Sequence, residues 1–224
     1  MPVWHGQNDT LGDYESSAFF IRHDPTGQEF LFFGDVSPDS LSSKPQTISV
    51  WRAAAPKIPS TLSTIFIECS WPSGRSDEQL YGHLSPEHLV DELTALAAEV
   101  AAVRSAAAAT ATATAAKSSH ESTASYVAAA SAADKPKRKK RRRRNRSVDA
   151  DSKPSEPLAG LRIYVIHCKE DLEREFSRPI YHVIRDQVES LVRAKGLGAE
   201  VLSAEQGMTI SMFCGHLSSL RTSY

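Results

Sequence analysis

The feature that most limits how this chain can fold is a long low-complexity stretch in its middle. Residues 106–157 begin with an alanine- and threonine-rich run, continue with the basic run KPKRKKRRRRNR at 135–146 and end with SVDADSKPSEP. Such a stretch buries too little apolar surface to offset the conformational entropy that ordering costs. We therefore expect a disordered insertion, whose alanine-rich start can extend the preceding helix by a few turns.

Sequence that looks folded lies on both sides of this insertion. Residues 1–105 and 158–210 alternate apolar runs with turn-forming residues, and 211–224 form a C-terminal tail. The two parts are expected to make one interrupted domain, because 224 residues with 41% hydrophobic and 24% charged residues suit a single good-sized core.

The cysteines and the apolar runs indicate in which cellular compartment the protein is expected. Cys69, Cys168 and Cys214 are too few and too scattered for a disulfide framework or a cysteine-rich zinc module, and they suit a reducing compartment. No apolar run is expected to reach the roughly 20 residues of a membrane span. The start MPVWHGQNDT lacks the features of a secretory signal. We expect a cytoplasmic protein, with the nucleus as the alternative.

Periodicity and turn residues predict an α/β fold. One helix is expected to begin at Pro86, with Ser85 as its N-cap, and another to cover 178–195 before Gly196. The turn DPTG joins the first two predicted strands into a hairpin. Strands alternating with helices are typical of α/β proteins. The predicted strands are 16–23, 28–34, 63–69, 161–167 and 199–203.

Potential metal ligands follow several apolar segments. The run FLFFG leads directly to Asp35, and an acid at the end of a core strand is costly unless a cation meets it. His167 and Glu68 also end predicted strands, His5 follows PVW, and His83 precedes a helix. Strand ends of α/β folds converge on one edge, and imidazoles with carboxylates suit Zn²⁺. Each residue by itself is more often an ordinary surface, turn or ion-pair residue.

The order of these motifs is more specific than any single residue. FFGDVSPDS, IFIECSWP, LYGHLSPEHLVDEL and IYVIHCKED resemble the class II cyclic-nucleotide phosphodiesterases of fungi, members of the metallo-β-lactamase superfamily. The resemblance covers about 1–100 and 158–210. It implies a metallo-β-lactamase-like αββα sandwich. It also implies metal-dependent hydrolysis of cAMP to the 5′-nucleotide in cyclic-nucleotide signalling, with cGMP as an alternative substrate.

The resemblance also implies roles for the candidate residues. His5 would complete the shell of a first metal ion, Asp35 would bridge two ions, and His167 would bind the second. The ions would be divalent, with zinc favoured over manganese and magnesium. Glu68 and His83 resemble an acid and its orienting base that protonate the leaving 3′-oxygen. The alternative for this pair is a structural hydrogen bond without a chemical role.

One hallmark of that family does not occur in this sequence. No His-x-His-x-Asp-His motif is present, and the match begins at about residue 2. We therefore expect only the C-terminal portion of the sandwich, an incomplete two-metal site and an uncovered apolar sheet face. The alternatives to an active phosphodiesterase are an inactive fragment and a regulatory remnant.

The basic run 135–146 supports a different class of function. Ten of its twelve residues are lysine or arginine, although the net charge of the whole chain is only -1. Such a run can bind a nuclear import receptor, nucleic acid or another polyanion, or it can remain a solvated loop. A binding protein that acts through this loop is therefore a further alternative. The oligomeric state is left open.

Overall fold

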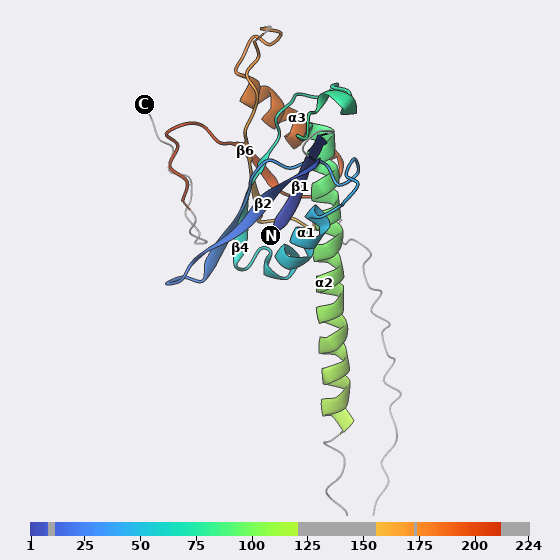
Figure 1. Ribbon diagram of the computed structural model, residues 1–224. Coiled ribbons are helices and arrows are strands. Elements are labelled where there is room, and N and C mark those ends of the chain that lie inside the picture. Colours follow the sequence, from blue (N-terminus) through green and yellow to red (C-terminus); the bar gives the residue numbers. More distant parts are fainter. Residues whose placement is uncertain (9–11, 121–155, 173, 212–224) are drawn as a thin grey trace, which may run out of the picture. The chain divides into compact units, whose positions relative to one another are not determined.

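The computed structural model describes residues 1–8, 12–120, 156–172 and 174–211 (Figure 1). Two compact units divide the chain: Met1–Val103 with Glu156–Tyr224, and Arg104–Ser155. The first unit contains the sheet and the candidate site. The described part of the second unit is helical. Residues 121–155 of the predicted disordered insertion, with the basic run, lie outside the described residues, as do residues 212–224 of the predicted tail.

A six-stranded sheet with the order β1-β2-β3-β4-β5-β6 forms the first unit. The pairs β1·β2 and β2·β3 are antiparallel, and the pairs from β3 to β6 are parallel. All predicted strands occur, while β1 had been expected only as a short apolar segment. The strands are β1 (Pro2–Asn8), β2 (Gly12–His23), β3 (Gln28–Phe33), β4 (Leu62–Glu68), β5 (Arg162–Ile166) and β6 (Glu200–Ser203).

Three α-helices accompany the sheet in the described residues: α1 (Thr47–Ala54), α2 (Pro86–His120) and α3 (Ile180–Ala194). Short 3₁₀ turns occupy Ala55–Lys57 and Asp77–Gln79. Helices α2 and α3 begin close to their predicted starts, whereas α1 was not predicted. Residues 106–120, the alanine-rich start of the predicted insertion, continue α2 to His120, because alanine is the strongest helix former. This is the extension by a few turns that the sequence analysis allowed for.

One face of the sheet carries the core. The side chains of Leu31, Ile65 and Ile163 are fully buried and belong to the same apolar cluster as residues of the helices. The ring of Phe33 packs 5.1 Å from that of Trp51 in α1. Figure 1 shows α1 and the first turns of α2 beside the sheet. The helices contribute Val50, Trp51 and Ala54 from α1, Leu89, Leu93, Leu96 and Val100 from α2, and Ile184, Val188 and Val192 from α3.

The opposite face of the sheet is aromatic and partly exposed. The pairing register aligns Phe19 with Phe32, Phe32 with Phe66 and Phe66 with Tyr164 across four strands. Phe66 stacks on Tyr164 at 5.0 Å, and the exposed fractions of Phe19, Ile21 and Phe32 are 54%, 44% and 37%. We call Phe19, Ile21, Phe32, Phe66 and Tyr164 the aromatic face. The exposed part of this face is made by Phe19, Ile21 and Phe32, whereas Tyr164 is only 4% exposed.

Helix α2 corrects one detail of the sequence prediction. By length and composition, its segment Pro86–Thr112 is long and apolar enough to cross a bilayer. The sequence analysis had expected no segment of this kind. The core helix of a globular protein passes the same test. Leu89, Leu93 and Leu96 are buried in the core, and most of the remaining apolarity comes from alanines. Core packing accounts for these leucines and helix propensity for the alanines, while 22% of the apolar window is buried.

Candidate active site at the carboxyl edge of the sheet

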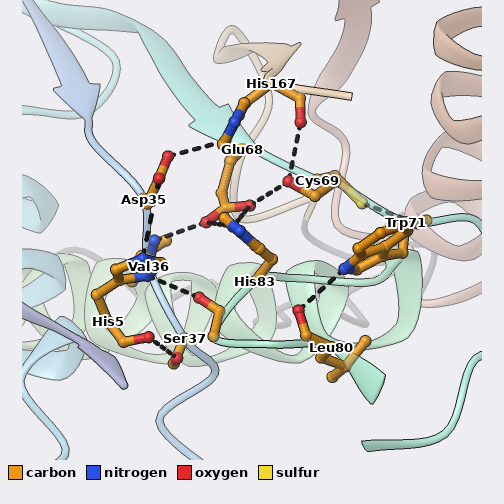
Figure 2. A network of polar contacts seen from close by, with 12 residues as sticks. His5, Asp35, Val36, Ser37, Glu68, Cys69, Trp71, Leu80, His83 and His167 are labelled. Atoms are coloured by element: carbon orange, nitrogen blue, oxygen red, sulfur yellow. Dashed lines mark hydrogen bonds and ion pairs between the residues drawn. The ribbon is translucent and has the colours of Figure 1, made fainter. Parts of the chain in front are cut away.

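The candidate ligands lie together because the strands that carry them run in the same direction. Asp35 comes two residues after β3, Glu68 ends β4, and His167 directly follows β5. These strands are parallel, so their carboxyl ends share one edge of the sheet. His5 lies in β1 at an irregularity between Trp4 and Gly6, and such bulges re-aim a side chain. Figure 2 shows the resulting cluster.

Asp35 stands between two imidazoles. Its Oδ1 lies 2.8 Å from Nδ1 of His167, and its Oδ2 lies 3.9 Å from Nε2 of His5. All three side chains are partly open to solvent, with exposed fractions between 29% and 41%. The structure thus brings together the three residues that the sequence predicts as metal ligands, from positions far apart in the chain.

The backbone around His5 fixes the orientation of its ring. Nδ1 of His5 lies 2.9 Å from the carbonyl oxygen of Gly82, which only accepts, so Nδ1 carries the proton. Ser37 donates from its hydroxyl to the backbone carbonyl of His5 at 2.6 Å. A Cβ on Gly82 would lie 2.2 Å from that same carbonyl oxygen, and the φ of Gly82 is +82°. Only glycine permits this approach, which leaves Nε2 of His5 facing Asp35.

Glu68 is buried, and its carboxylate contacts several residues of the site. Its Oε1 accepts the backbone N–H of Val36 at 2.7 Å, and its Oε2 lies 2.7 Å from the hydroxyl of Ser70. Nδ1 of His83 lies 2.9 Å from Oε2 and 3.0 Å from Oε1. The hydroxyl of Ser70 is also 2.8 Å from the carbonyl oxygen of His167. Glu68 therefore links the ends of β3, β4 and β5 while it orients the ring of His83.

His83 lies between the other two imidazoles. Its ring centroid is 5.2 Å from that of His5 and 5.1 Å from that of His167. One potential ligand atom from each of Asp35, Glu68, His83 and His167 lies within 4.8 Å of the others. His167 has a φ of +56°, a left-handed conformation that is costly for a residue with a side chain. Such strain commonly marks functional sites.

Sequence reasoning missed Ser70 and Lys169. Nζ of Lys169 lies 3.2 Å from Nε2 of His167, so the ring nitrogen that does not face Asp35 contacts an ammonium group. The spacing His-Cys-Lys after a predicted strand was the available signal for Lys169. Ser70, two residues after Glu68, gives no comparable signal, because serines are frequent after strands. Both residues connect to candidate ligands without being candidates themselves.

Two nearby residues lie outside the cluster. Cys168 packs against the core, and burial raises the pKa of its thiol to about 12. The side chain of His88 is only 15% exposed. Its Nδ1 lies 2.8 Å from the hydroxyl of Ser85, and its Nε2 lies 3.5 Å from Asp77. His88 thus stabilises the start of α2.

Imidazoles and carboxylates collected at the carboxyl edge of a mixed sheet define an α/β protein with a candidate divalent-cation centre. The sequence profile of the family described as cAMP phosphodiesterases class-II matches residues 1–121. This match covers more than half of the chain. The chain therefore belongs to the class-II cAMP phosphodiesterase family, as its motifs predict.

Individual relatives agree with this assignment over part of their length. A 3′,5′-cyclic-nucleotide phosphodiesterase of Schizosaccharomyces pombe is 44% identical over 100 residues, which are 44% of this chain and 28% of that protein. The 3′,5′-cyclic-nucleotide phosphodiesterase 1 of Saccharomyces cerevisiae is 37% identical over 97 residues, which are 42% of this chain and 26% of that protein. The matched region thus spans about a quarter of the length of these curated relatives.

A solved structure supports the fold. The crystal structure of unliganded yeast PDE1 matches with a TM-score of 0.61 at 23% identity. The match covers 92% of this chain and 43% of the yeast chain. The predicted α/β, metallo-β-lactamase-like fold is confirmed by this likeness, for the part of that fold which the chain spans.

Proposed function

We propose that the chain acts as a metal-dependent 3′,5′-cyclic-nucleotide phosphodiesterase that hydrolyses cAMP, with cGMP as an alternative substrate, to the 5′-nucleotide. The observation that carries this proposal is the position of Asp35, whose two oxygens each face an imidazole from a distant strand. Family membership and the names of the relatives support the substrate class.

The residues at the edge fit a divalent cation of the zinc type. His5, Asp35 and His167 offer two ring nitrogens and a carboxylate, which are the donors that zinc takes in proteins. Backbone hydrogen bonding to a ligating imidazole, as in the contact between His5 and Gly82, is typical of metal ligands. Such a cation, when bound, polarises the phosphoryl oxygens and lowers the pKa of water.

Glu68 and His83 would serve the leaving group. Hydrolysis adds the hydroxyl of water to phosphorus and breaks the bond from phosphorus to O3′, so O3′ must gain a proton. His83, held by the carboxylate of Glu68, is placed to carry that proton as a general acid. The surrounding donors from Val36 and Ser70 keep Glu68 in position.

A cavity beside His5 is the space that we propose for the nucleotide; of the five candidate site residues, His5 alone lines it. Its volume is about 590 Å³, within the range of small-molecule sites. Aromatic and apolar side chains suit a nucleobase. The lining includes Trp4, Tyr14, Leu41, Leu80 and Tyr81.

The second candidate function is a catalytically inactive remnant that regulates an intact relative. It is favoured by the ligand set, because the metal ligands predicted within the described residues are His5, Asp35 and His167. Three protein ligands suffice for one catalytic zinc ion and not for two. We therefore expect hydrolysis to be slow.

Chromatography of the reaction products distinguishes the enzymatic proposal from the inactive remnant. The purified chain is incubated with cAMP and with Zn²⁺, Mn²⁺ or Mg²⁺, and 5′-AMP is quantified. The proposal expects slow formation of 5′-AMP that Asp35→Asn abolishes and that the exposed control Asp24→Asn leaves unchanged. Equal product from the chain and from Asp35→Asn would overturn the enzymatic proposal and favour the remnant.

The basic run 135–146 carries a separate proposal about location and partners. We propose that it directs a cytoplasmic chain to the nucleus through an import receptor, or binds a polyanion, because its charge is concentrated in one run. A fluorescent fusion tests this in cells. Nuclear signal should disappear when the lysines and arginines of the run become glutamine. An unchanged distribution would contradict an import signal.

A further inference from the structure

We propose that the site also accepts a linear 3′,5′-linked dinucleotide, with one base in the cavity beside His5 and the other in a second cavity beside Lys169. A cyclic nucleotide and a dinucleotide contain the same phosphodiester group, in which phosphorus joins O3′ to O5′. The inference rests on the proposed function for its hydrolytic chemistry, and it adds a class of substrate that has two bases.

The second cavity is the first argument. Its volume is about 600 Å³, close to the 590 Å³ of the cavity beside His5. The two cavities adjoin different members of the cluster, because His5 lines the first, and Lys169, whose Nζ lies 3.2 Å from Nε2 of His167, lines the second. A cyclic nucleotide has a single base and fills only one of them. The lining of the second cavity includes Trp71, Ser73, Arg75, Gln79, Lys169 and Phe176.

The position of Asp35 between the residues that adjoin the two cavities is the second argument. Its Oδ2 lies 3.9 Å from Nε2 of His5, and its Oδ1 lies 2.8 Å from Nδ1 of His167 (Figure 2). The proposed function places the phosphodiester that is cleaved at this edge. In a dinucleotide the two nucleosides leave the phosphate in different directions, so one extends past His5 and the other past His167 toward Lys169.

The wall of the second cavity suits a base, which is the third argument. The guanidinium carbon of Arg75 lies 3.7 Å from the centre of the Trp71 ring, and Nε of Arg75 donates to the carbonyl of Gln79 at 2.9 Å. These two contacts hold the guanidinium in place as a flat surface. Unpaired bases stack on aromatic rings and on arginine planes, and the cavity offers both, because Phe176 also lines it.

The acidic residues of the second cavity are compatible with a base. The carboxylate of Asp171 accepts the N–H groups of Glu175 and Phe176 at 3.0 and 2.9 Å, which orders the turn that carries Phe176. Glu170 and Glu175 are exposed, and a carboxylate accepts hydrogen bonds from the exocyclic amino groups of bases. The ammonium of Lys169 lies at the end of the cavity that adjoins the cluster, where it can pair with the phosphate of the substrate.

One segment forms part of the wall of both cavities. Trp71 lines the second cavity, and its Nε1 donates at 2.9 Å to the carbonyl of Leu80, which lines the first. The rings of Trp71 and Tyr81 meet edge to face with their centroids 6.5 Å apart, and Tyr81 also lines the first cavity. These contacts fix the two cavities relative to each other, as a ligand with two bases requires.

The chemistry of the reaction is the same for both classes of substrate. Water adds its hydroxyl to phosphorus, the bond from phosphorus to O3′ breaks, and O3′ gains a proton. A cyclic substrate gives one product, the 5′-nucleotide. A dinucleotide gives two products, a nucleoside with a free 3′-hydroxyl and a 5′-nucleotide.

Chromatography with two substrates tests the inference. The full chain is incubated with the dinucleotide ApA or with cAMP under the same metal conditions, and equal amounts of adenosine and 5′-AMP are expected from ApA. Phe176→Ala should lower kcat/KM for ApA about 10-fold relative to cAMP, because one stacked base loses its partner. Phe19→Ala, on the aromatic face, is the control that should leave this ratio unchanged. Formation of 5′-AMP from cAMP without adenosine from ApA, or an unchanged ratio in Phe176→Ala, would overturn the inference and leave the proposed function standing.

Binding by the wild-type chain is a second measurement, which depends neither on turnover nor on variants. In calorimetric titration ApA should bind at least about 10-fold more tightly than cAMP, because its second base adds stacking. Equal or weaker binding of ApA would refute the role of the second cavity. Tighter binding of ApA by a chain that hydrolyses neither compound would support the two base cavities and overturn the enzymatic proposal.

Discussion

At the scale of single residues, Lys169 brings a positive charge next to the site. Its ammonium is 3.2 Å from Nε2 of His167, on the ring that also contacts Asp35. A cation bound by His167 would meet this positive charge at short range, and two like charges near a protein surface repel each other appreciably. Lys169 therefore competes with a metal ion for His167.

Removing that charge should strengthen metal binding. We expect Lys169→Met to raise the affinity for Zn²⁺ about 3- to 10-fold, because the ion no longer has to displace an ammonium. Calorimetric titration measures this, with Lys195→Met as the control, because Lys195 pairs with Asp91 away from the cluster. A lower affinity in Lys169→Met would show that Lys169 supports the site and does not compete.

The residue scale also shows what the sequence can and cannot predict. Asp35 was predictable, because a buried apolar run that ends on an acid demands a positive partner. The motif resemblance likewise identified Glu68 and His83, which the structure places in contact. The N–H of Val36 and the hydroxyl of Ser70 were not predictable, since a backbone group and a common polar residue carry no signature of their role.

At the scale of elements, helix α1 begins through a remote cap. The carboxylate of Asp39 accepts the N–H groups of Gln46, Thr47 and Ile48 at 2.9–3.1 Å. Its own N–H donates to Glu92 of α2 at 2.8 Å. The helix escaped prediction because its cap lies several residues before its first turn, beyond the usual N-cap position.

Loss of this cap should destabilise the fold measurably. We expect Asp39→Ala to lower the free energy of unfolding by about 1–3 kcal/mol, because three helix N–H groups lose their acceptor. Urea denaturation followed by tryptophan fluorescence measures this, since Trp51 lies in α1. Asp24→Ala, at an exposed turn, should change it by less than about 0.5 kcal/mol. Equal stability of the two variants would contradict the role of Asp39.

The start of α2 should show a dependence on pH through Glu87. Burial acts to raise the pKa of Glu87, but hydrogen bonds from its own backbone N–H and from Ser73 and Ser85, with the charge of His88, outweigh burial and lower it. A lowered pKa in the folded state stabilises the fold above the ordinary pKa of glutamate. That stabilisation is lost as the pH falls through the lowered value.

Replacing Glu87 by glutamine tests this sign. Near neutral pH the free energy of unfolding of the variant should be lower than that of the wild-type chain by less than about 1 kcal/mol. The effect is small because Glu87 is exposed and solvent screens its interactions. The difference from the wild-type chain should shrink as the pH falls from about 6 to about 3. Urea denaturation across this range measures it. A difference that grows toward acid pH would contradict the lowered pKa.

At the scale of the whole molecule, the aromatic face is an apolar surface that is partly open to solvent. Phe19 and Phe32 are directly paired across β2 and β3, and both are exposed. Contiguous exposed apolar surface of this kind favours contact with another protein surface. We therefore expect the purified chain to self-associate through the aromatic face.

A charged substitution on the aromatic face should reduce that association. Phe19→Lys is expected to shift the sedimentation profile toward the monomer, because the ammonium is costly to bury between two such faces. Leu172→Lys is the control, since Leu172 is 83% exposed in a loop away from the sheet strands. Identical profiles for the wild-type chain and Phe19→Lys would contradict the role of the aromatic face.

The fold class of the whole molecule was predictable from the sequence, whereas some details of the fold were not. Strand periodicity, the hairpin turn and the motif order indicated a metallo-β-lactamase-like α/β domain interrupted by a low-complexity insertion. The extension of α2 into the alanine-rich run was predictable from helix propensity. The residue at which the helix ends was not, because that run has no apolar stripe to mark the end.

The central claim is that His5, Asp35 and His167, from distant parts of the chain, form one cation site, with the pair Glu68 and His83 beside it. Calorimetric titration of Zn²⁺ into the wild-type chain, Asp35→Asn and the exposed control Asp24→Asn tests it most directly, because Asp35 is the residue that both imidazoles face. We predict saturable binding by the wild-type chain and by Asp24→Asn, and an affinity at least about 100-fold lower in Asp35→Asn. Equal affinity in Asp35→Asn and the wild-type chain would contradict the account.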